Sequence, residues 1–143
     1  HRRRIIFDKP QGFWVLEDHF LGKGLHLFEV LFHFSPMPVA PLENEGLCLT
    51  TANPEGANLV ILPLDTDGLG LELQTGWVSR RYGAKEEAPV ACYAREASAS
   101  LTLRFCLYPY LPGKQKAPET LRRHALELSS TWTAEAPIRW PRL

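Results

Sequence analysis

The sequence has no excess of either charge and no long apolar run, and each absence excludes a class of protein. Sixteen Lys and Arg residues balance sixteen Asp and Glu residues, so the formal net charge is zero. A neutral chain has no general attraction for polyanions, and we therefore expect no bulk nucleic-acid binding. No apolar run approaches the ~20 residues that a membrane-spanning helix needs, so no membrane insertion is expected.

Cysteine is scarce, which argues against two kinds of stabilised small domain. Cys48, Cys92 and Cys106 are odd in number and far apart in the sequence. They match neither a zinc motif nor the dense disulfide framework of a small secreted domain. We therefore expect them to be small buried hydrophobic side chains.

The five histidines form no metal-binding motif. No pair has the H-x-x-x-H spacing of a helical zinc site, and no Cys or acidic cluster completes a ligand set. His19, His26 and His33 could meet across a hairpin, but alternation sends His26 and His33 to opposite faces of a strand. We expect structural histidines and no metal or other cofactor in this chain.

Catalytic signatures are also missing. There is no nucleophile elbow, P-loop, dinucleotide Gly fingerprint or catalytic Cys–His arrangement. Asp65-x-Asp67-Gly68 begins like a calcium loop, but the rest of that motif is absent and turn chemistry explains it better. Because the chain starts at His1 rather than Met, we expect a piece of a longer protein whose active site lies largely elsewhere.

Apolar residues are plentiful, and the stretch from Gly12 to Pro36 organises the rest. It is predicted to be a β-hairpin with arms Phe13–Phe20 and Leu25–Phe34 joined by a turn at 21–24. In the second arm one face is largely aromatic, and it carries His26, Phe28, Val30, Phe32 and Phe34. The other face is still mostly apolar, whereas a strand with one wet face alternates cleanly. We therefore expect this arm in the middle of a sheet, with the aromatic face lining the main core.

Strand signals recur through residues 1–112, which we treat as one β-sandwich domain. About nine strands separated by turn signals are typical of an all-β antiparallel sandwich. Asp65–Gly68 is predicted to be a hairpin turn of the Asp-Gly kind. After it, Leu69, Leu71 and Leu73 are expected to point inward.

Residues 113–143 have two interpretations. Leu121, Ala125 and Leu128 have the spacing of a helix beginning near Pro118. The alternate residues from His124 to Leu128 fit a strand equally well, and the β-rich context favours the strand. Residues 132–143 are expected to be a terminal extension.

The segment from Trp77 to Gly83 is the candidate for ligand contact. Aromatic rings offer flat apolar faces to sugar rings, and Arg binds carboxylates or sulfates in a bidentate manner. Alternation places Trp77 on the core side and Arg80 and Tyr82 on the other, so Arg80 and Tyr82 are the predicted substrate-binding residues. The alternative is a strand end whose arginines pair with nearby glutamates at positions 72, 86 and 87.

Three stretches, taken in order, resemble a known family. They are HRRRIIF at residues 1–7, GFWVLEDHFLGKGLHLFEVLFHFSP at 12–36 and GWVSRRYGAKEEAPVACY at 76–93. Together they resemble the C-terminal β-domain of heparinase II/III-like polysaccharide lyases over about residues 1–112. The resemblance implies a fragment of a two-part enzyme, in which an N-terminal α/α toroid joins a supersandwich-like β-domain.

The resemblance also implies a function and a location. The substrates would be uronate-containing polysaccharides, such as a heparan-type glycosaminoglycan or alginate, cleaved by β-elimination in the periplasm or outside the cell. In the family, Tyr and His serve as the base and acid that this reaction needs. No residue here matches them or the family's zinc ligands, so the catalytic residues and any zinc are expected mostly outside this chain. The expected partners are the acidic polysaccharide and the missing N-terminal catalytic domain.

Two functions of other classes stay open. A non-catalytic carbohydrate-binding sandwich would present an exposed pair of coplanar aromatic rings. A purely structural sandwich would present a flat apolar patch to a neighbouring domain.

Overall fold

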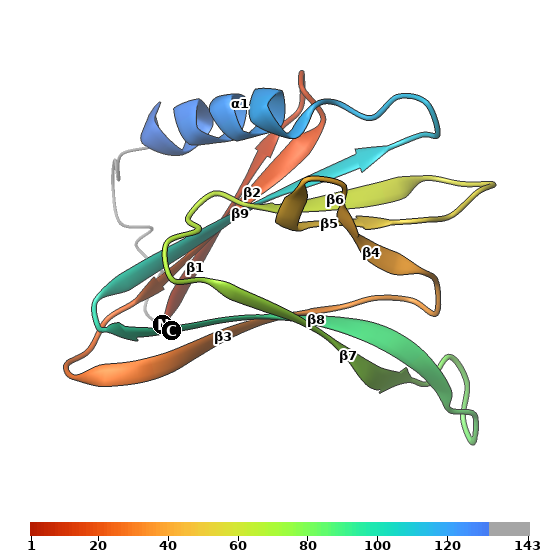
Figure 1. Cartoon of the computed structure of the whole chain (residues 1–143), viewed down its shortest axis with the longest axis horizontal. Helices are drawn as coiled ribbons and strands as arrows, with labels where there is room; N and C mark the ends of the chain where they lie inside the picture. Colours follow the sequence, from red (N-terminus) through yellow and green to blue (C-terminus); the bar gives the residue numbers. More distant parts are fainter. Residues whose placement is uncertain (132–143) are drawn as a thin grey trace, which may run out of the picture.

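The computed structural model describes residues 1–131, which form two antiparallel sheets and one helix (Figure 1). The strands are β1 (Arg2–Asp8), β2 (Phe13–Phe20), β3 (Leu25–His33), β4 (Val39–Leu42), β5 (Glu45–Thr51), β6 (Asn58–Pro63), β7 (Gly70–Val78), β8 (Glu86–Ser98) and β9 (Leu101–Tyr110), and the helix is α1 (Pro118–Thr131). The six-stranded sheet has the order β1-β2-β9-β6-β5-β4, and the three-stranded sheet has the order β3-β8-β7. The predicted antiparallel β-sandwich of about nine strands is confirmed.

The main core lies between the two sheets. Alternation along β9 turns Leu103 and Phe105 toward this core, where they meet Val30 of β3 and Tyr93 of β8. The rings of Tyr93 and Phe105 are 5.0 Å apart and edge-on, which is a favourable aromatic arrangement. The centre of the sandwich is therefore aromatic and contributed by both sheets.

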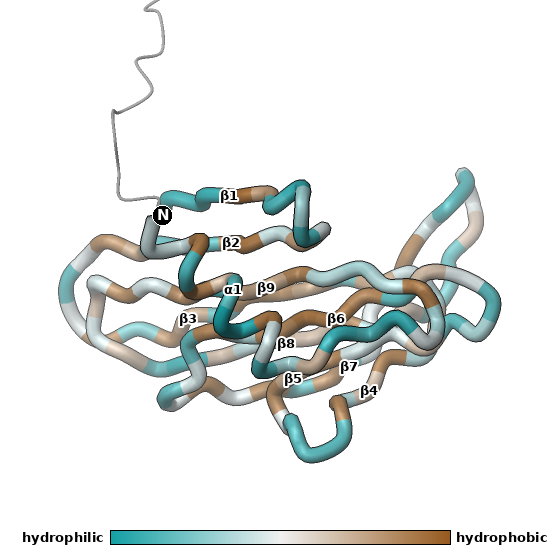
Figure 2. Tube along the Cα trace, turned by 90° about the horizontal axis from the view of Figure 1, so that it is seen from above, coloured by the Kyte–Doolittle hydropathy of each residue, from teal (hydrophilic) through white to brown (hydrophobic). Residues whose placement is uncertain are grey.

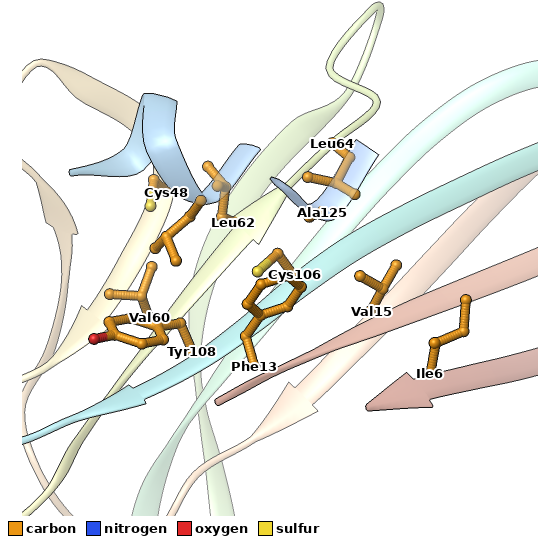
Figure 3. Packing of buried hydrophobic residues seen from close by; sticks show 11 residues of the cluster. Ile6, Phe13, Val15, Cys48, Val60, Leu62, Leu64, Cys106, Tyr108 and Ala125 are labelled. Carbon is orange, nitrogen blue, oxygen red and sulfur yellow. The ribbon is translucent and has the colours of Figure 1, made fainter. Parts of the chain in front are cut away.

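A second core fills the space between the six-stranded sheet and α1. Figure 3 shows Phe13, Val15, Cys106 and Tyr108 below the helix, and Ala125 packs against them from α1. Figure 2 looks from above and shows α1 lying across the strands of this sheet, with β1 at its edge. The six-stranded sheet is thus covered on both faces, which explains why its central strands are apolar on both sides.

The predicted hairpin of residues 12–36 is wrong. β2 pairs with β1 and β9, whereas β3 pairs with β8 in the other sheet. Both edges of β2 are therefore occupied, and the segment 21–24 carries the chain from one sheet to the other. A short Gly-containing connection suits a corner between sheets as well as a hairpin turn, so residue type alone does not separate them.

The facing predicted for the second arm is confirmed, but its position is not. Val30 is buried in the main core, and Phe28, Phe32 and Phe34 pack against that core. However, β3 is an edge strand rather than a central one. Its opposite face is not packed, since Leu25, Leu27 and Leu31 are 64%, 62% and 50% exposed.

The predicted turn at Asp65–Gly68 also joins different sheets instead of closing a hairpin. β6 belongs to the six-stranded sheet and β7 to the three-stranded sheet. The turn itself forms, because the Leu69 N–H donates to the Thr66 carbonyl at 3.1 Å and Gly68 has φ of 62°. Leu69 and Leu71 point into the core as predicted, whereas Leu73 is not part of that core and is 40% exposed.

The favoured strand in the C-terminal part is wrong, because residues 118–131 form α1. Leu121, Ala125 and Ser129 are buried at a spacing of one helical turn, which aligns them on the face toward the sheet. A β-rich chain still needs something to cover the outer face of a sheet, and here that cover is a helix. The extension predicted for residues 132–143 lies outside the described residues. Within the described part, no helix has the length and apolar character needed to cross a membrane.

The three cysteines are free and buried, as predicted. Burial is the main cause that raises the pKa of the Cys48 thiol from 9.0 to about 12, with a contribution from the charge of Glu45. Burial likewise raises the pKa of the Cys106 thiol to about 12. Both thiols therefore stay protonated in the folded domain well into the alkaline range.

We expect the domain to lose stability as the pH rises from about 9 to about 12, the interval between the ordinary and the folded-state pKa of these thiols. In this window the thiols ionise in the unfolded chain but not in the folded one, so the unfolded state binds fewer protons and is favoured. Melting temperatures measured from neutral pH upward test this. A Cys48→Ala/Cys106→Ala variant should show a shallower decline, and an equal slope in the two proteins would contradict the assignment.

Candidate functional site

The predicted ligand-contact segment forms the end of the β7–β8 hairpin, which curves away from the six-stranded sheet (Figure 1). The last paired residues are Val78 and Glu86. In the loop between them the Ala84 N–H donates to the Arg81 carbonyl at 3.1 Å. Gly83 has φ of 74°, a conformation that favours glycine. A tight turn therefore fixes the exit from the loop.

Trp77 lies on the hairpin surface and not in the core, so that prediction is wrong. Its side chain is 54% exposed, and the Lys85 Nζ lies 3.8 Å from the ring centroid in a cation–π contact. Trp77 is on the same face of β7 as Leu71, as the alternation predicts, but the end of the hairpin curves away from the opposite sheet (Figure 1). An inward-facing residue there has no second layer to bury it.

Arg80 and Tyr82 both lie at the exposed end of the hairpin. The Arg80 Nε is 3.5 Å from the Glu86 Oε1, so the alternative of an arginine paired with a nearby glutamate holds for this residue. Both side chains of this pair are about half exposed, and such pairs stabilise a protein by only ~0–1 kcal/mol. Tyr82 is fully exposed. The pair leaves Arg80 available to an external anion at low energetic cost.

A shallow groove of about 400 Å³ runs along the base of the same hairpin. Its lining includes Met37 and Val39 together with Leu73, Thr75 and Pro89 of the hairpin strands. Arg80 and Tyr82 are not part of this groove; they stand further along the hairpin. The structure therefore brings cationic and aromatic groups to one exposed end but does not enclose them in a pocket.

A second polar cluster, which the sequence reasoning missed, is built on the two buried carboxylates of β2. Asp18 is fully buried between the sheets and accepts hydrogen bonds from the Arg3 Nε at 2.7 Å and the Arg3 Nη2 at 2.8 Å. The His1 Nε2 lies 2.7 Å from the same carboxylate. The hydrogen bond to Asp18 is the main cause that raises the pKa of Arg3, so the guanidinium stays charged.

Glu17, the preceding residue, points to the opposite face and contacts α1. The Arg4 Nε donates to it at 2.6 Å, and the Ser129 hydroxyl of α1 donates to its other oxygen. Arg104 of β9 donates to the Ser129 Oγ at 3.3 Å and is held by two bonds to Asp65, of 2.9 and 2.6 Å. The hydrogen bond to Asp65 is the main cause that raises the pKa of Arg104. This network fastens the helix to the sheet.

A sequence signal for this cluster did exist. Two adjacent acids, Glu17 and Asp18, interrupt an apolar strand. The basic residues 2–4 precede them in the chain, on the other side of a predicted turn between two strands. The antiparallel register of β1 and β2 sets Arg3 opposite Asp18 and Arg4 opposite Glu17. Charges of opposite sign at matched distances from a turn thus predict cross-strand ion pairs.

The described residues do not fit a zinc site. No group of three or more His, Cys, Asp or Glu side chains gathers among residues 1–131. His1 and Asp18 supply two potential ligands, but both oxygens of Asp18 already accept bonds from the Arg3 guanidinium. The three histidines considered above do not meet either, since His19 contacts Thr102 in the six-stranded sheet while His26 and His33 belong to β3.

Comparisons with known proteins identify one family model and two solved structures that match this chain. A family model described as heparinase II/III-like, C-terminal, matches residues 1–117. Two solved structures of the heparan sulfate lyase HepC from Pedobacter heparinus match 80% of this chain with TM-scores of 0.70, one at 20% identity and a mutant at 19%. At such identities the likeness shows the fold alone. The chain covers 18% of the length of each HepC chain. No curated protein matches it by sequence.

Proposed function

The chain belongs to the heparinase II/III-like family, and from this membership we propose that it is the distal β-sandwich of a lyase that cleaves uronate-containing polysaccharides by β-elimination. The family resemblance drawn from the three sequence stretches is thereby confirmed. The match to the family's C-terminal model carries the proposal. HepC, which shares the fold, is a heparan sulfate lyase.

The catalytic residues of the proposed parent enzyme lie mostly outside this chain. β-Elimination needs a base, an acid and a group that neutralises the uronate carboxylate, all within hydrogen-bonding reach of one sugar ring. Among residues 1–131 the titratable groups that come nearest to such an arrangement are those of the buried network around Glu17 and Asp18. The carboxylates of this network are already engaged in internal ion pairs and hydrogen bonds. The parent enzyme would act in the periplasm or outside the cell, with any zinc ligands beyond the described residues.

The exposed end of the β7–β8 hairpin is the part of this chain that we assign to substrate contact. Arg80 supplies a cation for a carboxylate or sulfate, and Tyr82 supplies a ring for the apolar face of a sugar. Arg81 and Lys85 add positive charge to the same end. Because all these groups are solvent-exposed, the contribution of each to binding is expected to be modest.

In the full-length enzyme we expect Arg80→Ala to raise KM about two- to fivefold and to leave kcat unchanged, as loss of one exposed ionic contact implies. Initial rates on heparan sulfate, alginate and hyaluronan, followed through the absorbance of the unsaturated product, measure this. Arg123→Ala, on the exposed face of α1, is the matched control. Equal KM values for the two variants and the unsubstituted enzyme would show that the hairpin does not contribute to substrate binding.

The isolated 143-residue chain should give no unsaturated product above a denatured control. Turnover by this chain alone would show that a complete active site is present and would overturn the division of labour proposed here. Binding of the polysaccharide without turnover by either the chain or the longer protein would instead favour the non-catalytic carbohydrate-binding function.

A further inference from the structure

We infer that the outer face of the three-stranded sheet is the surface on which the preceding domain of the parent protein docks. This inference rests on the proposed function, because it takes the chain to be the C-terminal part of a larger enzyme. It assigns a role to a face that neither substrate contact nor the two cores explain.

The face carries a row of exposed leucines. Leu25, Leu27 and Leu31 lie on the outer side of β3 and are 64%, 62% and 50% exposed, with Glu29 between Leu27 and Leu31. The strand register sets Leu31 beside Cys92 of the central strand β8, whose side chain is buried, so the exposed apolar surface of this face belongs to β3. We call the outer face of the three-stranded sheet, with these leucines and with Glu29, Glu72 and Glu96, the leucine face. Exposed large apolar side chains that gather on one strand, rather than standing singly, indicate an interaction site.

The two sheets of the sandwich differ in how their outer faces are treated. α1 covers the outer face of the six-stranded sheet, as Figure 1 shows. No element within residues 1–131 covers the leucine face on the opposite side of the molecule. One outer face of the sandwich is thus covered by α1, and the exposed leucines of the other outer face have no covering element among the described residues.

The charges of the leucine face indicate what kind of partner fits. Glu29, Glu72 and Glu96 lie on it, and none of the outward-facing residues of β3, β8 and β7 is Lys or Arg. The Cys92 thiol lies between Glu29 and Glu72, and its pKa is raised. Burial is the largest cause, followed by the hydrogen bond to Glu29 and then by the negative charges of Glu29 and Glu72. Such a face repels an acidic polysaccharide. It suits a protein surface that pairs apolar side chains with Lys or Arg.

The N-terminus is placed so that a preceding domain can reach this face. The His1 ring stacks on Phe20 at 4.6 Å, and Phe20 lies 4.8 Å from Phe28 of β3. A chain that enters at His1 therefore enters beside the inner side of the edge strand whose outer side bears the leucines. HepC, of which this chain covers 18%, shows that relatives of this fold carry enough further chain to supply a domain.

Thiol labelling tests the inference directly. Leu27→Cys should react with a maleimide rapidly in the 143-residue chain and at least about tenfold more slowly in the longer protein. Leu111→Cys is the matched control, since Leu111 is 61% exposed against 62% for Leu27 and lies on the other sheet's side of the molecule. It should react equally in both proteins. The three native thiols are buried, so the background is low.

Charge reversal adds an independent arm. Glu72→Lys/Glu96→Lys, introduced with Leu27→Cys in the longer protein, should restore most of the labelling rate if the covering surface is basic. Equal labelling of Leu27→Cys in the two proteins would overturn the inference. So would protection that is already present in the 143-residue chain and disappears on dilution, since the occupant would then be a second copy. Labelling needs no enzymatic activity, so a failure of the proposed lyase function would be seen separately.

Discussion

Replacing Phe105 by Ala is expected to lower the free energy of unfolding by ~3–5 kcal/mol, a large share of the ~5–15 kcal/mol that stabilises a typical domain. Phe105 is fully buried, and its ring lies 5.2 Å from Phe32 and 5.0 Å from Tyr93. β9 is paired on both sides, by β2 and β6, so the backbone cannot move in to fill the space. A cavity would remain where the two sheets meet, and urea unfolding followed by tryptophan fluorescence would measure its cost.

Phe32→Ala supplies a graded comparison. Phe32 faces the same core, as expected from the alternation in β3, but it is only half-buried and belongs to an edge strand. The edge can relax, so the loss should be smaller than for Phe105→Ala. Glu72→Ala, on the outer face, should change little. Equal losses for the two phenylalanines would contradict this account of the core.

Glu17→Gln is expected to cost about 3 kcal/mol, the lower end of what breaking a buried ion pair costs, because the Arg4 side chain is 23% exposed and can be partly hydrated. The substitution also weakens the acceptor for the Ser129 hydroxyl, which links α1 to the sheet. The helix should therefore loosen before the sheets do. Hydrogen exchange of the α1 amides, compared with those of β9, gives the readout, together with the unfolding midpoint.

Asp18→Asn is the matched comparison, because Asp18 is as fully buried as Glu17 but has different partners. Its partners Arg3 and His1 have side chains that are 45% and 47% exposed, so they can turn to water when the carboxylate is lost. We expect a loss of about 1–2 kcal/mol and no change in α1 exchange. A larger loss for Asp18→Asn, or unchanged α1 exchange in Glu17→Gln, would refute the helix-fastening role.

The face of a strand on which each side chain lies could be predicted from the sequence, whereas the strands that pair with one another could not. Strand alternation identified the inward residues Phe28 and Val30 because the period of two is a local property of the chain. Which strand lies beside β2 depends on β9, whose residues are far away in the sequence, and no local pattern encodes that partner. Short connections such as 21–24 therefore look like hairpin turns although they cross between the sheets.

The same distinction explains the outcome at the candidate site. The aromatic and cationic composition of the β7–β8 hairpin is visible in the sequence, and the hairpin does form. The exposure of Trp77 depends on how the end of the hairpin curves away from the opposite sheet, which is a property of the assembled layers. The cluster on Glu17 and Asp18 could have been found, because its partners in β1 are local and the register follows from the turn between the two strands.

The central position of β9 has a consequence for how the protein is made. β9 is the last strand among residues 1–131, yet it joins the β1–β2 pair to the β4–β5–β6 group. On the ribosome these two parts must wait, with apolar faces uncovered, until the chain has been synthesised beyond Tyr110. Nascent chains that stop before β9 should aggregate or bind holdase chaperones, and release from the chaperone should coincide with the emergence of this strand.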